Sequence, residues 1–250
     1  MRLDKFLSNC KIGSRNDIKK FVKAKRVKIN GSIADKSDIK IDIDADEIIF
    51  DNKKIVYEKY IYLMLNKPKG VICSTYDKNE KTVIDILDDK YKDRGLFPVG
   101  RLDKDTVGLV IITNDGIFAH NSLSPKKHVL KKYFVFVTGK ITDSDVYLFK
   151  DGIILDGDYK CKPAKLKIIN AEDDKSSALV EISEGKFHQI KRMFASLDKK
   201  VLFLKRISFA DIELDENLKE GQYRPLNSNE INKLNIIREG NKWEISKNLF

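Results

Sequence analysis

The chain has 250 residues, enough for one large domain or two smaller ones, and its apolar fraction of 42% is typical of a globular protein. No apolar run reaches the length of a membrane span and the N-terminus lacks a signal-peptide pattern, so we expect a cytoplasmic protein without membrane contact. Three widely spaced cysteines and three scattered histidines argue against a disulfide framework and a metal site, whereas the net charge of +10 favours an anionic partner.

Charge is distributed unevenly at the start of the chain. Residues 1–34 contain ten Lys or Arg and two acids, whereas residues 35–51 contain two lysines and seven acids. A small unit with this pattern has a basic face and an acidic back, which solvation alone does not require. The pattern therefore predicts a surface for an anionic polymer.

Two short helices and a hairpin are predicted in this basic stretch. Leu3, Phe6 and Leu7 fall on one helical face. Further on, VKINGSI alternates around Asn30-Gly31, a strong signal for a two-residue hairpin turn. Asp4 lies in the first helical turn, and we interpret it as a charge that compensates the helix dipole beside Arg2.

The second helix is predicted to begin at Ser14. Ser14 is a favourable N-cap, and Asp17 stands three residues later, as in a capping box. Apolar positions repeat with helical spacing at Ile18, Phe21 and Val22. A different face carries a row of cations at every fourth residue, suited to contact with phosphates: Arg15, Lys19 and Lys23.

The stretches RLDKFLS and GSRNDIKKFVKAKRVKINGSI resemble the S4 RNA-binding domain, which grips structured RNA with a basic helix and a small hairpin. The resemblance covers about residues 1–45. It implies that several cations of this segment contact RNA: Arg2, Lys5, Arg15, Lys19, Lys23 and Arg26.

A second RLDK stands in a different setting. The run YIYLMLNKPKGVICS reads as a buried strand that breaks at Pro68 and Gly70. In LFPVGRLDKDTVGLVIITNDG, proline and glycine forbid a helix through 101–103, and 108–113 reads as a buried strand. Asp103 is thus expected on a loop that enters a buried strand, where catalytic groups are common. Alternatively, Asp103 caps a turn before Thr106 with Arg101 as its surface partner.

Two later segments carry further candidates. In YFVFV, Tyr133 shares one strand face with Val135 and Val137. In FHQIKRMFASL, Lys191 lies about 100° around the helix from Ile190 and borders the apolar stripe, whereas Arg192 lies about 200° away. The helical stripe itself is Ile190, Met193, Phe194 and Leu197.

Five stretches in order resemble the pseudouridine synthases: MLNKPKGVICS, GRLDKDTVGL, LKKYFVFV, EGKFHQIKRMFASL and GQYRPL. The resemblance implies that Asp103 is the indispensable carboxylate, that Tyr133 is the active-site tyrosine and that Lys191 is the active-site cation. An S4 domain in front, with HQIKRMF and KPKGVICS, is similar to the RsuA type, which modifies 16S rRNA. Ala210 stands where the family often has glycine, so we expect an altered turn there.

The implied reaction breaks the N1–C1′ bond of a uridine, turns the uracil and rejoins it through C5, so neither a cofactor nor a metal is required. Asp103 is expected to act as nucleophile or proton acceptor, and a nearby cation, Lys191, to favour its ionised form. Tyr133 is expected to stack on the flipped uracil. Arg101 is expected to fill the vacated stack or to hold a phosphate. His188 is expected to support the site or face RNA, and two more RNA contacts are expected at Lys67 and Arg192.

Structural readings remain for two of these residues. Lys191 could be a surface lysine with a buried stem, and Tyr133 a core tyrosine with a satisfied hydroxyl. A non-catalytic S4-type RNA- or ribosome-binding protein is the alternative for the whole chain, and a large-subunit 23S rRNA synthase is the alternative within the family.

The fold class predicted is α+β: a small α/β S4 domain, then a catalytic domain with a mixed, mainly antiparallel sheet flanked by helices and loops. We place the S4 domain at 1–58, the catalytic domain at 59–233 and a tail of unassigned role at 234–250. The expected partner is ribosomal RNA, as 16S rRNA or a small-subunit assembly intermediate, and the expected state is a monomer.

Overall fold

The computed structural model describes residues 1–43, 45–55, 57, 60–124, 127–155 and 158–238. The chain forms two compact units, residues 1–59 and residues 60–250. Each unit has a hydrophobic core of its own, and each is described here by itself.

The N-terminal unit consists of two helices and a four-stranded sheet of order β2-β1-β3-β4. Its elements are α1 (Leu3–Asn9), α2 (Arg15–Lys23), β1 (Val27–Ile29), β2 (Ser32–Ile33), β3 (Ile48–Phe50) and β4 (Lys53–Lys54).

Local signals in the sequence account for these elements. The capping box is present, because Ser14 Oγ accepts from the Asp17 N–H while the Asp17 side chain accepts from the Ser14 N–H. Asn30 and Gly31 both have positive φ, 48° and 82°, and close the β1–β2 hairpin as predicted. The predicted apolar faces of both helices form the core, except that Phe21 is only partly buried.

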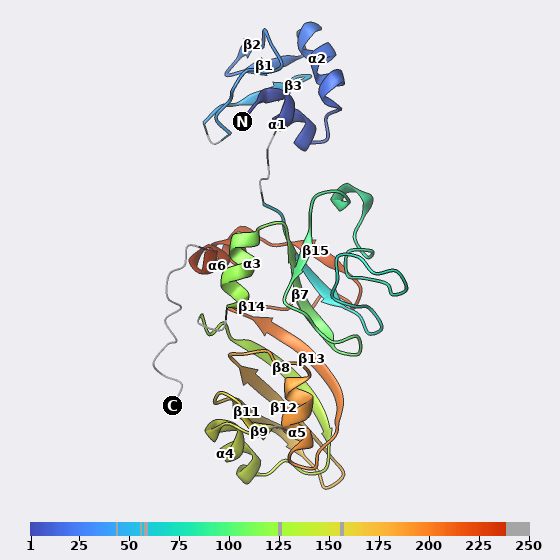
Figure 1. The fold of residues 1–250 in the computed structure, drawn as a ribbon, viewed down its shortest axis with the longest axis vertical. Helices are drawn as coiled ribbons and strands as arrows, with labels where there is room; N and C mark the ends of the chain where they lie inside the picture. The colour runs from blue at the N-terminus through green and yellow to red at the C-terminus, as the bar shows by residue number, and fades with distance from the viewer. Residues whose placement is uncertain (44, 56, 58–59, 125–126, 156–157, 239–250) are drawn as a thin grey trace. The chain divides into compact units, whose positions relative to one another are not determined.

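The second unit is built on one large sheet, in which β13 and β7 run parallel and the other paired strands run antiparallel (Figure 1). The predicted mixed, mainly antiparallel fold is thereby confirmed. The strand order is β11 (Lys165–Ala171), β12 (Lys175–Ile182), β8 (Lys131–Thr138), β13 (Val201–Phe209), β7 (Val107–Thr113), β5 (Tyr62–Lys67) and β15 (Tyr223–Pro225), with β6 (Phe97–Val99) beside β7 and β14 (Ile212–Glu213) beside β13.

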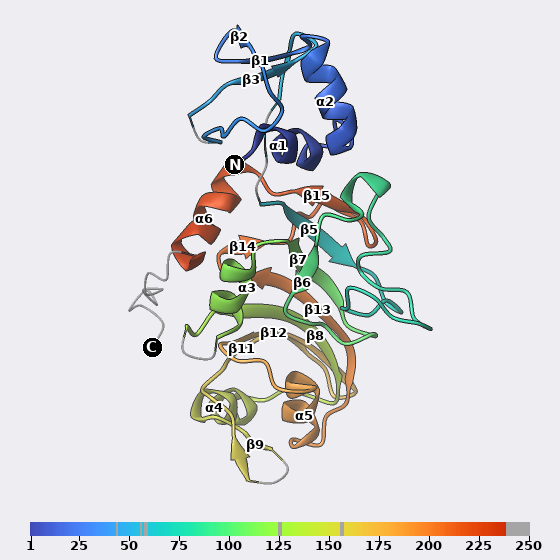
Figure 2. The same ribbon diagram turned by 45° about the horizontal axis from the view of Figure 1, so that its top comes forward.

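Helices cover the sheet in two groups. In both views α3 (Gly116–Leu123) lies beside α6 (Ser228–Arg238), while α4 (Asp143–Asp151) and α5 (Gln189–Ala195) lie at the other end of the sheet (Figures 1 and 2). The small elements that remain are the 3₁₀ turn η1 (Asp89–Tyr91) and the β9–β10 hairpin (Ile154–Leu155 with Tyr159–Lys160).

Strand β7 is buried on both faces, which explains its uninterrupted apolar sequence. Leu109 and Ile111 belong to the core under α3 and α6, whereas Val110 and Ile112 belong to the core under α4 and α5. Gly108 stands where β7 meets β13 and has φ +103°. The strand therefore forms the centre of the unit and fixes the position of the loop that precedes it.

One sequence expectation changes near the end of the chain. Helix α6 runs through residue 233, and Leu234 and Ile237 are core residues, so the expected boundary at 233 cuts a packed helix. The rest of the predicted tail, 239–250, lies outside the described residues. Ala210 adopts the left-handed conformation, with φ +56°, in the turn between β13 and β14.

Candidate active site

Asp103 lies on the loop between β6 and β7, where the sequence predicts it. The Thr106 N–H donates to the Asp103 carbonyl at 3.1 Å and closes a turn. Leu102, the preceding residue, is buried, and its N–H donates to the thiol of Cys73 at 3.3 Å. The Gly70 N–H donates to the Lys104 carbonyl at 2.8 Å, so the KPKG turn and the loop support each other. Backbone hydrogen bonds thus fix Asp103 without using its carboxylate.

Lys67 corrects a prediction. We expected an RNA contact, but the side chain is fully buried and its ammonium donates to three carbonyls, those of Pro68 at 3.0 Å, Lys104 at 3.4 Å and Thr106 at 2.8 Å. Burial lowers the pKa of Lys67. All residues of β5 are buried, so the Lys67 side chain stays inside the protein. It has no exposed surface for RNA, and its hydrogen bonds instead support the Asp103 loop.

The helix α5 brings Lys191 to Asp103. Lys191 Nζ lies 3.1 Å from Asp103 Oδ2 and 2.6 Å from Asp105 Oδ1. The Lys191 side chain is 25% exposed, so its ammonium is partly withdrawn from water. Burial opposes its charge, but the hydrogen bonds to Asp105 and Asp103 outweigh that effect and raise the pKa of Lys191. A helix border position therefore places a cation at the candidate carboxylate, as the helical wheel predicts.

Asp105 is a member of the site that sequence reasoning missed. Its hydrogen bond with Lys191 lowers the pKa of Asp105, and burial opposes this only in part. Lys191 therefore contacts two carboxylates instead of one. The signal was present in the sequence, since Asp105 stands two residues from Asp103 on the same loop, but loop geometry decides whether such neighbours converge.

His188 lies near the other oxygen of the Asp103 carboxylate. Its Nε2 lies 3.5 Å from Asp103 Oδ1. The residue is the N-cap of α5 and adopts the left-handed conformation, with φ 49°. Its ring stacks on that of Phe187, with centroids 3.8 Å apart and planes 19° apart.

A cavity of about 80 Å³ joins these groups to Tyr133. Tyr133 is buried and projects from β8 on the same face as Val135 and Val137, as predicted. Ile190 and Leu204 contribute an apolar part of the lining. The polar part consists of Arg101, Asp103, Thr106, Tyr133, Lys186, His188, Gln189 and Lys191.

A buried carboxylate braces the turn that carries His188. Glu184 accepts hydrogen bonds from Gln189 Nε2 at 2.6 Å, the Tyr159 hydroxyl at 2.8 Å and the Lys162 N–H at 3.0 Å. The bond to Glu184 raises the pKa of Tyr159 to about 12. This network links the β9–β10 hairpin to the start of α5, and no local sequence pattern announces it.

The N-terminal unit presents the cations that the sequence predicts. Of the predicted cations, Arg2, Lys19 and Lys23 line a groove of about 410 Å³ beside α2, and Lys5 and Arg15 are exposed. The same groove is also lined by Lys36, Asp35 and Asp38. Two cations of the predicted set also have structural partners. Arg2 binds Asp4, and Arg26 pairs with Asp51 and covers the rings of Phe21 and Phe50.

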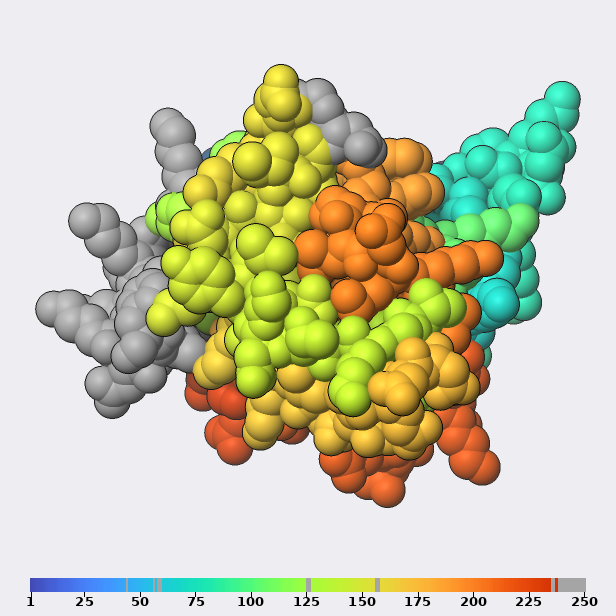
Figure 3. Space-filling view, turned by 90° about the horizontal axis from the view of Figure 1, so that it is seen from below, coloured from blue at the N-terminus to red at the C-terminus, as the bar shows by residue number. Residues whose placement is uncertain are grey.

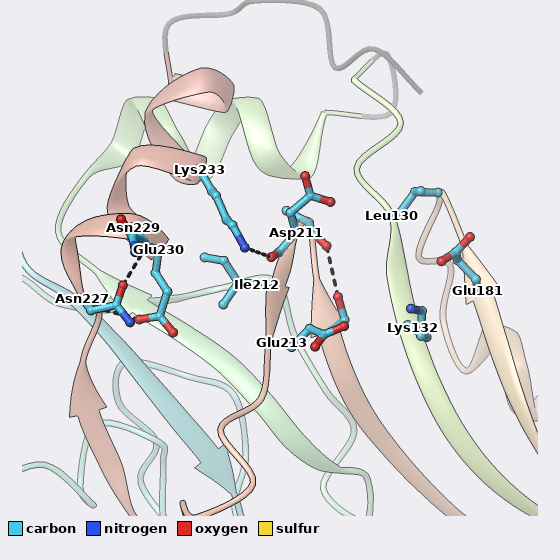
Figure 4. A pocket seen from close by; sticks show the side chains of 12 residues that line it. Leu130, Lys132, Glu181, Asp211, Ile212, Glu213, Asn227, Asn229, Glu230 and Lys233 are labelled. Carbon is cyan, nitrogen blue, oxygen red and sulfur yellow. Dashed lines mark hydrogen bonds between the residues drawn. The ribbon is translucent and has the colours of Figure 1, made fainter. Parts of the chain in front are cut away.

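Away from the predicted site, a larger cavity of about 440 Å³ lies between the start of α6, the β13–β14 turn and β8 (Figure 4). Lys233 crosses it and donates to the Asp211 carbonyl at 3.0 Å. Its lining includes none of Asp103, Tyr133 and Lys191. The smaller cavity is therefore the one lined by the predicted active-site residues Asp103, Tyr133 and Lys191.

Comparison with known proteins assigns the class. The family described as RNA pseudouridylate synthase matches residues 61–196, and the S4 domain matches residues 1–48. The chain is 40% identical to the ribosomal small subunit pseudouridine synthase A of Haemophilus influenzae, covering 94% of this chain and 99% of the relative. It is 41% identical to an uncharacterized RNA pseudouridine synthase, YtzG, of Bacillus subtilis, covering 94% and 98%. A crystal structure of a pseudouridylate synthase shares 40% identity and a TM-score of 0.65, covering 94% and 99%.

The chain belongs to the RNA pseudouridylate synthases, enzymes that isomerise uridine in RNA to pseudouridine, and it carries an N-terminal S4 domain. Among its relatives are several small-subunit synthases, including that of Escherichia coli, at 36% identity over 92% of this chain and 98% of the relative. In the described part of the chain, none of the helices is long and apolar enough to cross a bilayer.

Proposed function

We propose that this protein is the synthase that converts one specific uridine of 16S rRNA to pseudouridine, either in free rRNA or in a small-subunit assembly intermediate. The observation that carries the proposal is the Asp103 carboxylate, held 3.1 Å from Lys191 in a cavity shared with Tyr133. Similarity to several small-subunit synthases over most of their length supports the choice of 16S rRNA.

Each residue has a role in the proposed reaction. Asp103 is the nucleophile or proton acceptor during cleavage of the N1–C1′ bond. Lys191 supplies a positive counter-charge 3.1 Å from the Asp103 carboxylate during the reaction. Tyr133 stacks on the uracil after the nucleotide has left its helix, and the exposed Arg101 at the cavity meets the RNA backbone or fills the vacated stack.

The cation row on α2 supplies affinity for RNA in this proposal. Arg15, Lys19 and Lys23 are exposed and follow one helix face at intervals of four residues. Lys5 and Arg2 add positive charge nearby, and Arg192, which is half-buried, follows Lys191 on α5. Contacts of this kind bind phosphates without reading sequence, so the target uridine is selected by RNA shape and by the catalytic unit.

We further propose that the enzyme acts as a monomer in the cytoplasm. Asp103, Tyr133 and Lys191 of one chain line the same cavity, so these three residues need no second copy to meet. Light scattering with and without an rRNA fragment tests the monomer.

The test combines mapping with a labelled substrate. Pseudouridine mapping of both rRNAs from a deletion strain should show one uridine of 16S rRNA that is no longer converted, and a missing site in 23S rRNA instead would overturn the small-subunit assignment. In vitro, wild-type protein should release tritium from C5-labelled uridine in 16S rRNA. Asp103→Asn should bind the same RNA and release none, because the amide keeps the size of the carboxylate and lacks its nucleophilicity.

Asp4→Asn is the matched control for that assay, since Asp4 stands in the other RLDK. It changes the same residue type in the N-terminal unit, where Arg2 is the partner. Turnover by Asp4→Asn together with none by Asp103→Asn supports the assignment, and robust turnover by Asp103→Asn excludes it.

A further inference from the structure

Phe187 is a large apolar side chain in an unusual position. The residue is 74% exposed, although an apolar phenyl ring gains nothing from contact with water. It belongs to the turn before α5 and follows Lys186, which lines the active-site cavity, and precedes His188, which also lines it. Phe187 thus stands at the rim of the candidate active site.

The ring of Phe187 packs against a neighbouring ring. It stacks on His188 with centroids 3.8 Å apart and an interplanar angle of 19°. His188 in turn reaches Asp103, with 3.5 Å between Nε2 and Oδ1. One face of Phe187 is therefore occupied by a ring that touches the catalytic carboxylate.

The backbone beneath the ring is braced. Gln189 accepts the Lys186 N–H at 2.9 Å and donates to the buried Glu184 at 2.6 Å. Lys186 also places its ammonium 5.0 Å from the centroid of the Tyr159 ring. Figure 3 shows the orange segment around α5 at the surface, beside the yellow segments of the β9–β10 region. Rigid support makes the exposed ring a preorganised binding surface.

We propose that Phe187 is a stacking platform for a base of the RNA next to the target uridine. The inference rests on the proposed function and adds a residue that positions the substrate. When the uridine flips toward Asp103, its neighbour in the strand loses a stacking partner. The exposed phenyl ring replaces that partner, and Lys186 beside it supplies positive charge for the connecting phosphate.

Tyr147 offers a matched control. It is also an aromatic residue exposed to solvent, at 70%, but it lies on α4 and is not part of the cavity lining. If exposed aromatic surface alone promoted RNA binding, both residues would contribute. If stacking next to the flipped uridine is responsible, Phe187 contributes and Tyr147 does not.

The experiment is a double-mutant cycle with the full-length protein. Wild type and Phe187→Ala are each titrated with an rRNA fragment containing the target uridine, and with fragments in which a neighbouring nucleotide on either side is abasic. Stacking is worth about 1–3 kcal/mol per base, so Phe187→Ala should weaken binding of the intact fragment about 5- to 150-fold. At one neighbouring position, the abasic fragment lacks the base that would stack on Phe187. That fragment should therefore bind wild type and Phe187→Ala with equal affinity.

Two further variants exclude a folding defect. Phe187→Trp should keep the affinity of wild type, since an aromatic ring is restored, and Tyr147→Ala should bind like wild type. The proposal would be overturned if Phe187→Ala bound the intact fragment as tightly as wild type. It would also be overturned if, at every neighbouring position, the loss caused by Phe187→Ala and the loss caused by the abasic nucleotide were additive. Turnover of the intact fragment by wild type is measured in the same series, so a failure of the proposed function appears there and is separate from a failure of the cycle.

Discussion

Asp4 and Asp103 stand in the same tetrapeptide, RLDK, and have different surroundings. Asp4 is 1% exposed in α1, binds the guanidinium of Arg2 at 2.6 Å and accepts the Lys5 N–H. The hydrogen bond from Arg2 lowers the pKa of Asp4, so its contribution to stability is present at neutral pH and is lost as pH falls through that lowered value. Asp103 instead faces a cavity with Lys191 and His188. The backbone around each aspartate, helix or loop, decides its role.

Lys191 carries the sharpest prediction at the scale of single residues. Lys191→Met removes the ammonium 3.1 Å from Asp103 and the hydrogen bond that lowers the pKa of Asp105, so the carboxylate pair accepts a proton more readily. The single-turnover rate should fall near neutral pH and recover as pH rises. On the acidic limb of the pH–rate profile, a tenfold loss of rate corresponds to about 1.4 kcal/mol of lost stabilisation. Rates across pH at saturating RNA measure this displacement.

Two variants complete that experiment. Lys191→Arg should retain more activity than Lys191→Met, because the charge is kept. Arg192→Met should weaken RNA binding and leave the acidic limb in place. If the acidic limb of the pH–rate profile stayed in place in Lys191→Met and moved in Arg192→Met, Arg192 rather than Lys191 would be the cation that acts on Asp103.

At the scale of elements, the approach of β7 to β13 depends on one glycine. A Cβ at Gly108 would lie 2.3 Å from the Arg206 carbonyl oxygen, and its φ of +103° is one that other residues rarely adopt. The buried Arg206 also donates from Nε to the Leu109 carbonyl at 2.7 Å. These interactions join the two strands that run parallel at the base of the Asp103 loop.

Gly108→Ala should therefore destabilise the catalytic unit by roughly 3 kcal/mol or more, because both the backbone conformation and the strand spacing must change. Gly116→Ala is the control, since an added Cβ there meets no atom within 4 Å and the residue begins α3. Urea unfolding followed by fluorescence measures both. Equal stabilities for the two variants would mean that β7 and β13 can separate at little cost.

Strand β8 contains a lysine whose charge the fold opposes. Burial, with Arg206 as a second cause, lowers the pKa of Lys131 to about 8, while its ammonium donates to the Val129 carbonyl at 2.9 Å. Between pH 8 and the ordinary value of 10.5 the unfolded chain binds the proton and the folded protein does not. Stability should rise with pH across this window, and below pH 8 the penalty is fully present.

Lys131→Met should consequently stabilise the protein at pH 7 by about 1–3 kcal/mol. It should also remove the increase in stability between pH 8 and 10.5 that Lys131 causes. Lys132→Met, the next residue of the same strand, provides the control. Unfolding free energies at pH 7 and pH 10 give the comparison. A lower stability of Lys131→Met at pH 7 would show that the bond to Val129 outweighs the cost of burying the charge.

At the scale of the whole molecule, the two units divide binding and chemistry between them in the proposed function. Deletion of residues 1–58 should weaken RNA binding much more than it disturbs the catalytic fold, which has its own core. The slope of log affinity against log salt should become less steep by about 0.7–0.9 for each phosphate that the shortened protein no longer neutralises. Circular dichroism of the shortened protein reports its fold.

A milder variant of the same test keeps the N-terminal unit. Replacing Arg15, Lys19 and Lys23 by alanine removes three exposed cations of α2, so the salt slope should decrease by roughly two to three units. An unchanged slope in both proteins would mean that this row of cations is a solvated surface that RNA does not touch.

The sequence by itself determined much of this protein, because the signals concerned are local. The α2 capping box, the Asn30-Gly31 turn and the apolar run of β7 each depend on residues within a few positions of one another. The order of five motifs was enough to indicate the family that the comparisons confirm. The border position of Lys191 on its helix likewise indicated that it could reach inward.

Only the tertiary structure decided which charges meet. Asp105 joins Lys191 across 86 residues of chain, Lys67 is enclosed by the carbonyls of a loop distant in sequence, and Glu184 ties the β9–β10 hairpin to α5. The same is true of Phe187, whose exposure cannot be read from its hydrophobicity. The physical reason is that helix and turn signals act along the chain, whereas burial and ion pairing depend on distances that exist only after the sheet has brought its strands together.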